Sequence, residues 1–223
     1  MNHLIVSHLI RKDLQMTWPF TALAALAGCA ALALFYFGSN AIGIAGIVAY
    51  FIVLVMLGIL PMTFIINERK KQTLAFLMSL PVTAGQYGLS KLASSLGIFV
   101  VPWLLLVGLA LTLIVSRGDI PNGLIPLAFV LMLLPVVGFV LMLSVALVSE
   151  SETRSVVTMA AVNISYSFVW VGISTTPGLT RDAGNPAPVW NQTILSAIAA
   201  EVAVIVAILA LTLIMQSRKR DFV

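Results

Sequence analysis

Six long apolar runs dominate the chain, and short polar segments separate them. A helix that crosses the hydrocarbon core of a bilayer needs about 20 mostly apolar residues. Each run is long enough for one crossing, so the pattern predicts an all-α integral membrane protein with a single transmembrane domain over residues 1–223. The predicted transmembrane helices cover about 18–37, 41–66, 92–115, 124–148, 156–174 and 194–215.

The first 16 residues have a different pattern, in which apolar and polar positions alternate with the period of a helix. Val6, Ile10 and Leu14 share one side of this helix, and His8 and Arg11 belong to the other. An amphipathic helix with basic residues on its polar side is typical of the membrane interface. We therefore predict an amphipathic N-terminal interfacial helix over 1–16.

The composition excludes an ordinary soluble enzyme, since 61% of the residues are hydrophobic and 9% are charged, whereas soluble domains have about 25% charged residues. The net charge of +4 does not indicate a nucleic-acid partner, because cytoplasmic loops of membrane proteins are rich in Lys and Arg. With six crossings, only Arg117 and Arg181 of the 12 basic residues lie opposite the termini. We expect a multi-pass protein of the cell membrane with both termini in the cytoplasm.

None of the usual catalytic motifs is present. The sequence lacks the HExxH motif of zinc proteases, the GxSxG motif of serine hydrolases and the GxxxxGK[ST] motif that binds ATP. His3 and His8 are not accompanied by clustered carboxylates, and Cys29 is the single cysteine, so a metal site is not expected. We predict no catalytic residue, no metal and no cofactor in this chain.

The connection over 67–91 is the longest one that polar residues flank. Leu74, Leu77 and Met78 form an apolar face at helical spacing, and Pro81 is expected to end that helix. Thr83 is suited to the N-cap of a second helix. The apolar face either packs on lipid head groups and neighbouring helices or binds a soluble partner.

The same connection resembles a known family. In order it contains Glu68-Arg69, Thr73-Leu74, Leu80-Pro81-Val82-Thr83 and Lys91-Leu92. This order and spacing resemble the loop after the second transmembrane helix of ABC-2 type transporter permeases, although Gln72 stands where that family often has glycine. Residues 175–193 form a shorter link than extended external helices would need.

The resemblance implies the membrane subunit of an ATP-driven exporter. Such permeases move a hydrophobic or amphipathic compound by alternating access, as a homodimer or heterodimer in membrane lipid, with two separate ABC ATPase subunits that bind ATP and Mg. The segment 4–16 would be the connecting helix, and the residues that couple to the ATPase would be Lys70, Lys71, Leu74, Leu77, Met78 and Leu80. The alternatives are a non-transporting assembly or regulatory subunit and an intramembrane enzyme.

A substrate pathway is suggested by polar side chains in the last two predicted transmembrane helices. Asn163, Tyr166, Ser167 and Trp170 share one side of the fifth helix, and Glu201 is the ionisable residue of the sixth. Polar groups within a membrane face protein or a wet cavity, so this side forms either a cavity wall or hydrogen bonds between packed helices. Glu201 is expected at the depth of Ser167 and Tyr166, as a structural group or as a cavity carboxylate.

Overall fold

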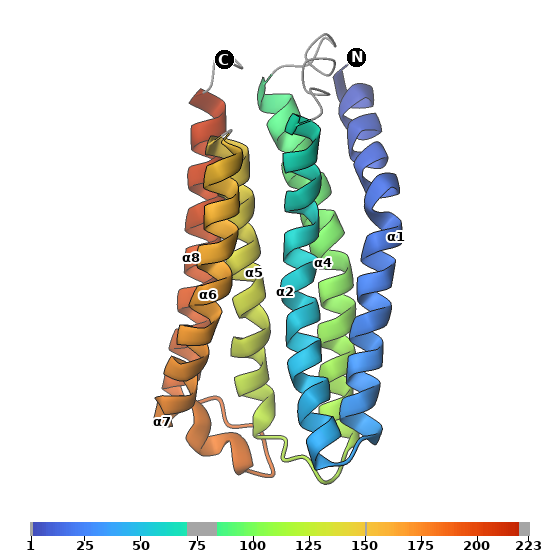
Figure 1. Ribbon diagram of the computed structural model, residues 1–223. Coiled ribbons are helices and arrows are strands. Elements are labelled where there is room, and N and C mark those ends of the chain that lie inside the picture. The colour runs from blue at the N-terminus through green and yellow to red at the C-terminus, as the bar shows by residue number, and fades with distance from the viewer. Residues whose placement is uncertain (1, 71–83, 150, 219–223) are drawn as a thin grey trace.

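The computed structural model describes residues 2–70, 84–149 and 151–218. In this part of the chain, six long helices form an up-and-down bundle with both termini at one end (Figure 1). All six contain a segment long and apolar enough to cross a membrane, so the prediction of an all-α protein with six transmembrane helices is confirmed. The helices are α1 (Asn2–Phe37), α2 (Asn40–Lys70), α4 (Ala84–Ser116), α5 (Leu124–Ser149), α6 (Glu152–Thr175) and α8 (Gln192–Arg218).

The structure differs from the sequence-based expectation at the N-terminus, because α1 is one uninterrupted helix from Asn2 to Phe37. The expected interfacial helix over 1–16 and the first transmembrane helix are therefore parts of the same element. Pro19 lies inside it and removes one backbone hydrogen bond without ending the helix. The stretch of α1 that is apolar enough to cross a membrane starts at Ser7, so it includes part of the segment expected at the interface.

The helices form two groups of three, with α1, α2 and α4 on one side and α5, α6 and α8 on the other (Figure 1). Phe99 of α4 and Phe139 of α5 stack at the junction, with ring centroids 4.2 Å apart. Trp103 Nε1 of α4 also donates a hydrogen bond to the carbonyl of Met132 in α5, at 2.9 Å. Because lipid tails are as apolar as these side chains, close packing and such hydrogen bonds hold transmembrane helices together.

Short connections close the end of the bundle opposite the termini. Between α4 and α5, the Arg117 guanidinium donates to the carbonyls of Phe35 and Tyr36 at the end of α1, and its hydrogen bond with Asp119 lowers the pKa of that carboxyl. The link between α6 and α8 contains two four-residue helices, α7 (Pro177–Thr180) and η1 (Arg181–Gly184), followed by the non-helical residues 185–191. The helices of this connection are thus short.

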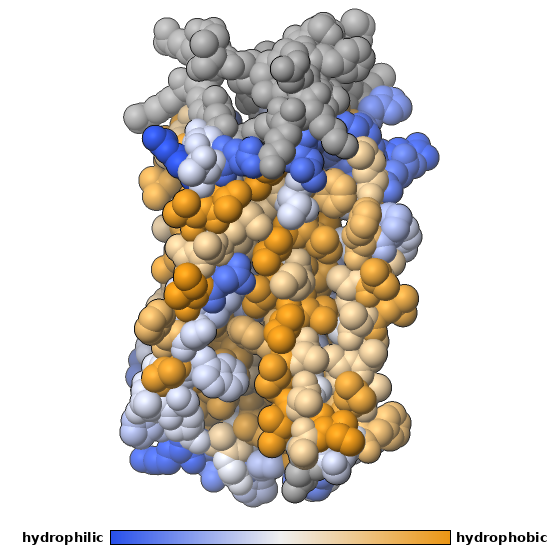
Figure 2. Space-filling view, viewed as in Figure 1, coloured by the Kyte–Doolittle hydropathy of each residue, from blue (hydrophilic) through white to orange (hydrophobic). Residues whose placement is uncertain are grey.

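The surface of the bundle has a broad hydrophobic belt between two hydrophilic ends (Figure 2). Large apolar side chains of every transmembrane helix are exposed on it, among them Leu23, Ile44, Val101 and Val206. The belt is the surface expected to face lipid, since each of the six helices is long and apolar enough to cross a membrane. Over α6, hydrophilic and intermediate side chains interrupt the belt (Figure 2).

Candidate functional site

One of the six predicted coupling residues falls in the part of the chain that the structure describes. Lys70 is the last residue of α2. The other five coupling residues lie outside the described residues: Lys71, Leu74, Leu77, Met78 and Leu80. The structure does describe the two places from which this connection leaves the bundle, at the end of α2 and at the start of α4.

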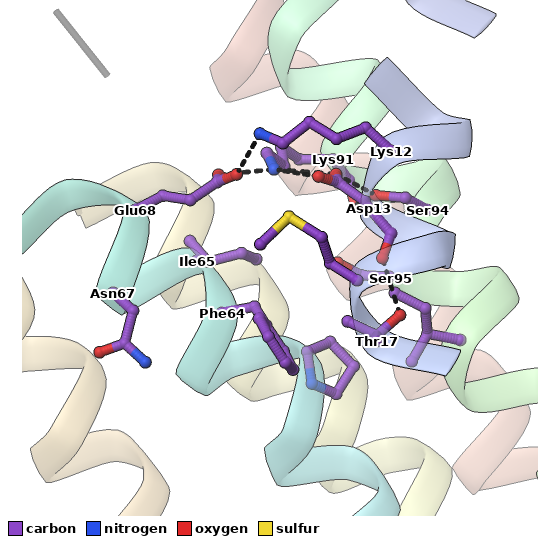
Figure 3. Close-up of a pocket in the computed structure, with 13 residues that line it drawn as sticks. Lys12, Asp13, Thr17, Phe64, Ile65, Asn67, Glu68, Lys91, Ser94 and Ser95 are labelled. Atoms are coloured by element: carbon purple, nitrogen blue, oxygen red, sulfur yellow. Dashed lines mark hydrogen bonds and ion pairs between the residues drawn. The ribbon is translucent and has the colours of Figure 1, made fainter. Parts of the chain in front are cut away.

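A cluster of four charged side chains occupies this place, built from three helices (Figure 3). Lys91 Nζ of α4 lies 2.9 and 2.8 Å from the two carboxylate oxygens of Asp13 in α1. The same ammonium lies 2.6 Å from Glu68 Oε2 in α2. Lys12 Nζ of α1 lies 3.1 Å from the other oxygen of Glu68. We call Lys12, Asp13, Glu68 and Lys91 the charge cluster.

The inner half of the charge cluster is buried, since Asp13 is 8% and Lys91 is 5% exposed. The Ser94 hydroxyl lies 3.0 Å from Asp13 Oδ2 and supplies a further hydrogen bond. Two ammonium groups and two carboxylates give the cluster no net charge. Buried ion pairs gain little over apolar packing, but removal of one partner leaves an uncompensated charge and costs about 3–5 kcal/mol. The four side chains therefore depend on one another.

A cavity of about 250 Å³ lies beside the charge cluster. Besides the four charges, it is lined by Met16 and Thr17 of α1, Phe64 and Asn67 of α2, and Ser95 of α4 (Figure 3). Its lining thus mixes apolar and polar groups from the same three helices. Ion pairs join the three helices at one edge of the cavity, and the helices do not pack tightly across the cavity itself.

Sequence reasoning did not identify this cluster. The loop pattern includes Glu68 and Lys91 but does not indicate that they are partners, and the amphipathic pattern over 1–16 places Asp13 on neither side. The sequence does contain one indication of a buried polar side of this helix, because Asp13, Thr17 and Thr21 recur every four residues. In the structure all three are buried. That polar stripe crosses the expected boundary between the interfacial helix and the first transmembrane helix.

The predicted polar side of α6 is only partly a single face. Ser167 and Trp170 are exposed, with Trp170 at 48%, and Asn163 is half-buried. Tyr166 instead is buried, 8% exposed, and its ring packs edge-on against Phe51 of α2 with centroids 6.0 Å apart. The helical turn places Tyr166 toward α2 and α5. Trp170, one turn further on, also lies beside Phe51, with ring centroids 6.3 Å apart, but it stays partly exposed.

Glu201 lies on the side of α8 that faces the rest of the bundle. Ile198 and Ile205, on the same side of α8, pack against buried clusters, and α8 packs mainly on α5. Glu201 Oε2 is buried without a hydrogen-bond partner among the described residues, and so is the Tyr166 hydroxyl. Glu201 and Tyr166 therefore form no hydrogen bond with each other.

None of these places is suited to a metal ion. In residues 2–70, 84–149 and 151–218, no group of three His, Cys, Asp or Glu side chains comes together. The two carboxylates of the charge cluster are already neutralised by Lys12 and Lys91.

Six helices long and apolar enough to cross a membrane define a polytopic membrane protein. A family model described as ABC-2 family transporter protein matches residues 8–219, and the chain belongs to this family. It is a permease of an ABC transporter, which implies partnership with ABC ATPase subunits. Comparisons with curated proteins and with solved structures gave no match.

Proposed function

We propose that this permease exports a hydrophobic or amphipathic compound across the cell membrane by alternating access. The observation that carries the proposal is the outward side of α6, where Ser167 and Trp170 are exposed within a transmembrane helix. Serine hydroxyls are poorly suited to lipid, and an exposed tryptophan can bind an apolar or aromatic compound by stacking. This side of α6 then contributes to the pathway, with Glu201 deeper in the bundle.

A second permease chain completes the pathway in this proposal, as a homodimer or a heterodimer. Ser167 is exposed, and Trp170 stays 48% exposed although it lies beside Phe51 of α2, so the same chain covers this side of α6 only in part. A second chain facing it would enclose these groups between two permeases. The remaining apolar surface would contact lipid.

The distribution of basic residues supports an orientation in the membrane. The end of the bundle that carries the termini has Arg11 and Lys12 of α1, Lys91 of α4 and Arg154 of α6, and the other end has Arg117 and Arg181. The excess of basic residues supports a cytoplasmic location for both termini. The connection over 67–91 would then face the cytoplasm, where it can contact ATPase subunits.

Energy comes from outside this chain. Two ATPase subunits bind ATP and Mg, and the segment from Lys70 to Leu80 contacts them. ATP favours the closed pair of ATPases, and this preference shifts the permease between its two access states. The transmembrane helices then move as packed bodies rather than by unfolding.

The test begins with purification of the tagged chain from membranes, where ATPase subunits should be retained. The complex in liposomes is then exposed to a panel of cationic, neutral and anionic amphiphiles while ATP hydrolysis is measured. At least one class should stimulate hydrolysis, and Trp170→Ala should raise its half-maximal concentration about two- to tenfold, as expected for loss of an aromatic contact of about 0.5–1.5 kcal/mol.

Phe168→Ala is the matched control, because Phe168 is an exposed aromatic residue on another side of α6. It should leave the stimulation unchanged. A chain that purifies without any ATPase contradicts the proposal. A complex that hydrolyses ATP but responds to no amphiphile and moves none supports the alternative, a non-transporting assembly or regulatory subunit.

A further inference from the structure

Lys91 joins three transmembrane helices through one ammonium group (Figure 3). Lys91 Nζ donates hydrogen bonds to both carboxylate oxygens of Asp13, at 2.9 and 2.8 Å, and forms an ion pair with Glu68 Oε2 at 2.6 Å. Asp13 belongs to α1, Glu68 to α2 and Lys91 to α4. The ends of these helices are thus fixed to a common point.

This point is also where the connection between α2 and α4 starts and ends. Glu68 lies two residues before the end of α2 at Lys70, and Lys91 lies near the start of α4 at Ala84. The Lys91–Glu68 ion pair therefore joins the two ends of the connection. The Lys91–Asp13 pair joins them both to α1.

The rest of the bundle is attached differently. The group α1, α2 and α4 meets α5 through apolar and neutral contacts, such as the stacked rings of Phe99 and Phe139. Packed apolar surfaces can slide by small steps, whereas an ion cluster fixes the directions and distances of its members. Apolar side chains could have joined these helix ends at no loss of stability. Stability alone therefore does not explain why charged side chains join these helix ends.

We propose that Asp13, Glu68 and Lys91 are positioning residues for coupling, which make α1, α2 and α4 move as one body when the ATPase displaces the connection between α2 and α4. The proposal rests on the proposed function. Lys12 has a lesser part, because its side chain is 39% exposed and contacts only Glu68 within the cluster. The charge cluster transmits the displacement to all three helices. The contacts with α5 allow the two groups of helices to move relative to each other.

The experiment measures movement between the two groups of helices at the end opposite the termini. Spin labels are placed at Ser39→Cys, between α1 and α2, and Thr175→Cys, at the end of α6, in a Cys29→Ala background. Both positions are exposed. Complexes with the ATPase contain one labelled chain diluted among cysteine-free chains. The distance between the labels is recorded with and without Mg and a non-hydrolysable ATP analogue.

The reference protein should show a nucleotide-dependent change in this distance. The neutral variant Asp13→Asn/Lys91→Gln should retain the ATPase and its hydrolysis, but the change should fall to less than half. Lys91→Arg keeps the charge and should retain the change. Thr212→Val breaks the buried contact of Thr212 with Ser144 between α8 and α5 and should also leave the change intact.

A full change in the neutral variant overturns the proposal, whatever its melting temperature, because the cluster is then only structural. If the neutral variant does not fold, Glu68→Gln gives the decision, since Glu68 lies at the less buried side of the cluster. It should reduce the change in part, and a full change again overturns the proposal. A reference complex without ATPase or without any change in distance instead contradicts the proposed function.

Discussion

Lys91 and Glu201 are two ionisable side chains that the same bundle accommodates in different ways. Lys91 is almost completely buried, but its charge is compensated by Asp13 and Glu68. Glu201 lies within a transmembrane helix and has one carboxylate oxygen that is buried without a hydrogen-bond partner among the described residues. The buried charge of Lys91 thus depends on both carboxylates, whereas the Glu201 oxygen lowers the stability without involving other charged groups.

Lys91→Met should therefore be far more damaging than Lys12→Ala. The first change leaves two buried carboxylates without their ammonium and should lower the free energy of unfolding by about 3–5 kcal/mol. Lys12 belongs to a partly exposed pair, for which less than about 1 kcal/mol is expected. Thermal unfolding in detergent measures both. Equal losses for the two variants would contradict the central place of Lys91.

Glu201→Leu should raise the melting temperature, because it removes a buried polar atom without a partner, and such an atom costs about 1–3 kcal/mol. Glu201→Gln should leave the melting temperature near that of the unmodified protein. If Glu201 belongs to the pathway, both variants should lose amphiphile-stimulated hydrolysis of ATP. Unimpaired transport by the Leu variant would exclude this role, and a lower melting temperature would show that the carboxylate has a structural partner.

Among the single helices, α1 is defined by its length and by its close contact with α2. α1 continues from Asn2 to Phe37 and therefore carries both Asp13 at one end and the crossing with α2 at the other. At that crossing, a Cβ atom on Gly46 would lie 2.6 Å from the backbone nitrogen of Phe35 and 2.7 Å from the carbonyl oxygen of Ala31. Glycine lets the two backbones approach, as small residues commonly do between transmembrane helices.

Gly46→Leu should force α1 and α2 apart and lower the free energy of unfolding by at least about 1–3 kcal/mol. Gly108→Leu is the matched control, because a Cβ atom there would meet nothing within 4 Å. The control should change the stability little. Thermal unfolding of the two purified variants decides, and equal stability of the Gly46 variant and the control would contradict the close crossing.

The predicted coupling helix is a second element whose role can be tested. Leu74→Asp/Leu77→Asp should release the ATPase or separate its hydrolysis from transport, since burial of each leucine in a protein contact contributes about 1.5–3 kcal/mol. Membrane insertion and the melting temperature of the permease alone should not change. Co-purification of the ATPase and transport in liposomes are the measurements. A variant with intact complex and transport would show that these leucines do not bind the ATPase.

The whole molecule is a bundle of two helix groups whose termini share one end (Figure 1). An even number of crossings places both termini on one side of the membrane, and the distribution of basic residues favours the cytoplasm. In the proposed orientation, the charge cluster lies on the cytoplasmic side, beside the connection that is proposed to contact the ATPase. Orientation and coupling are therefore linked in one hypothesis.

The orientation is tested with single cysteines in a Cys29→Ala background. Ser39→Cys, Asn122→Cys and Asn185→Cys lie at the end opposite the termini and should react with an impermeant thiol reagent added to intact cells. Gln72→Cys should react only after the cells are opened. Labelling of position 72 from outside would reverse the orientation, and with it the proposed place of the ATPase.

The periodic and compositional features of the chain were sufficient for its architecture. A run of apolar residues such as 194–215 can satisfy its backbone in a bilayer only as a helix, so six runs determine six transmembrane helices whatever their neighbours. The family followed from residues close together in sequence, Glu68 to Leu92, and the match over 8–219 confirmed it. These features depend on local pattern, which the sequence contains in full.

The contacts between helices depended on the tertiary structure, because they join residues far apart in sequence through a rotation about each helix axis. A rotation of one residue, about 100°, separates Tyr166, which is buried against α2 and α5, from Ser167, which is exposed. Asp13 and Lys91 are separated by 78 positions, and no periodicity within either helix indicates that they face one another. The sequence by itself thus determined which segments cross the membrane, and only the packing of those segments decided which polar groups meet inside it.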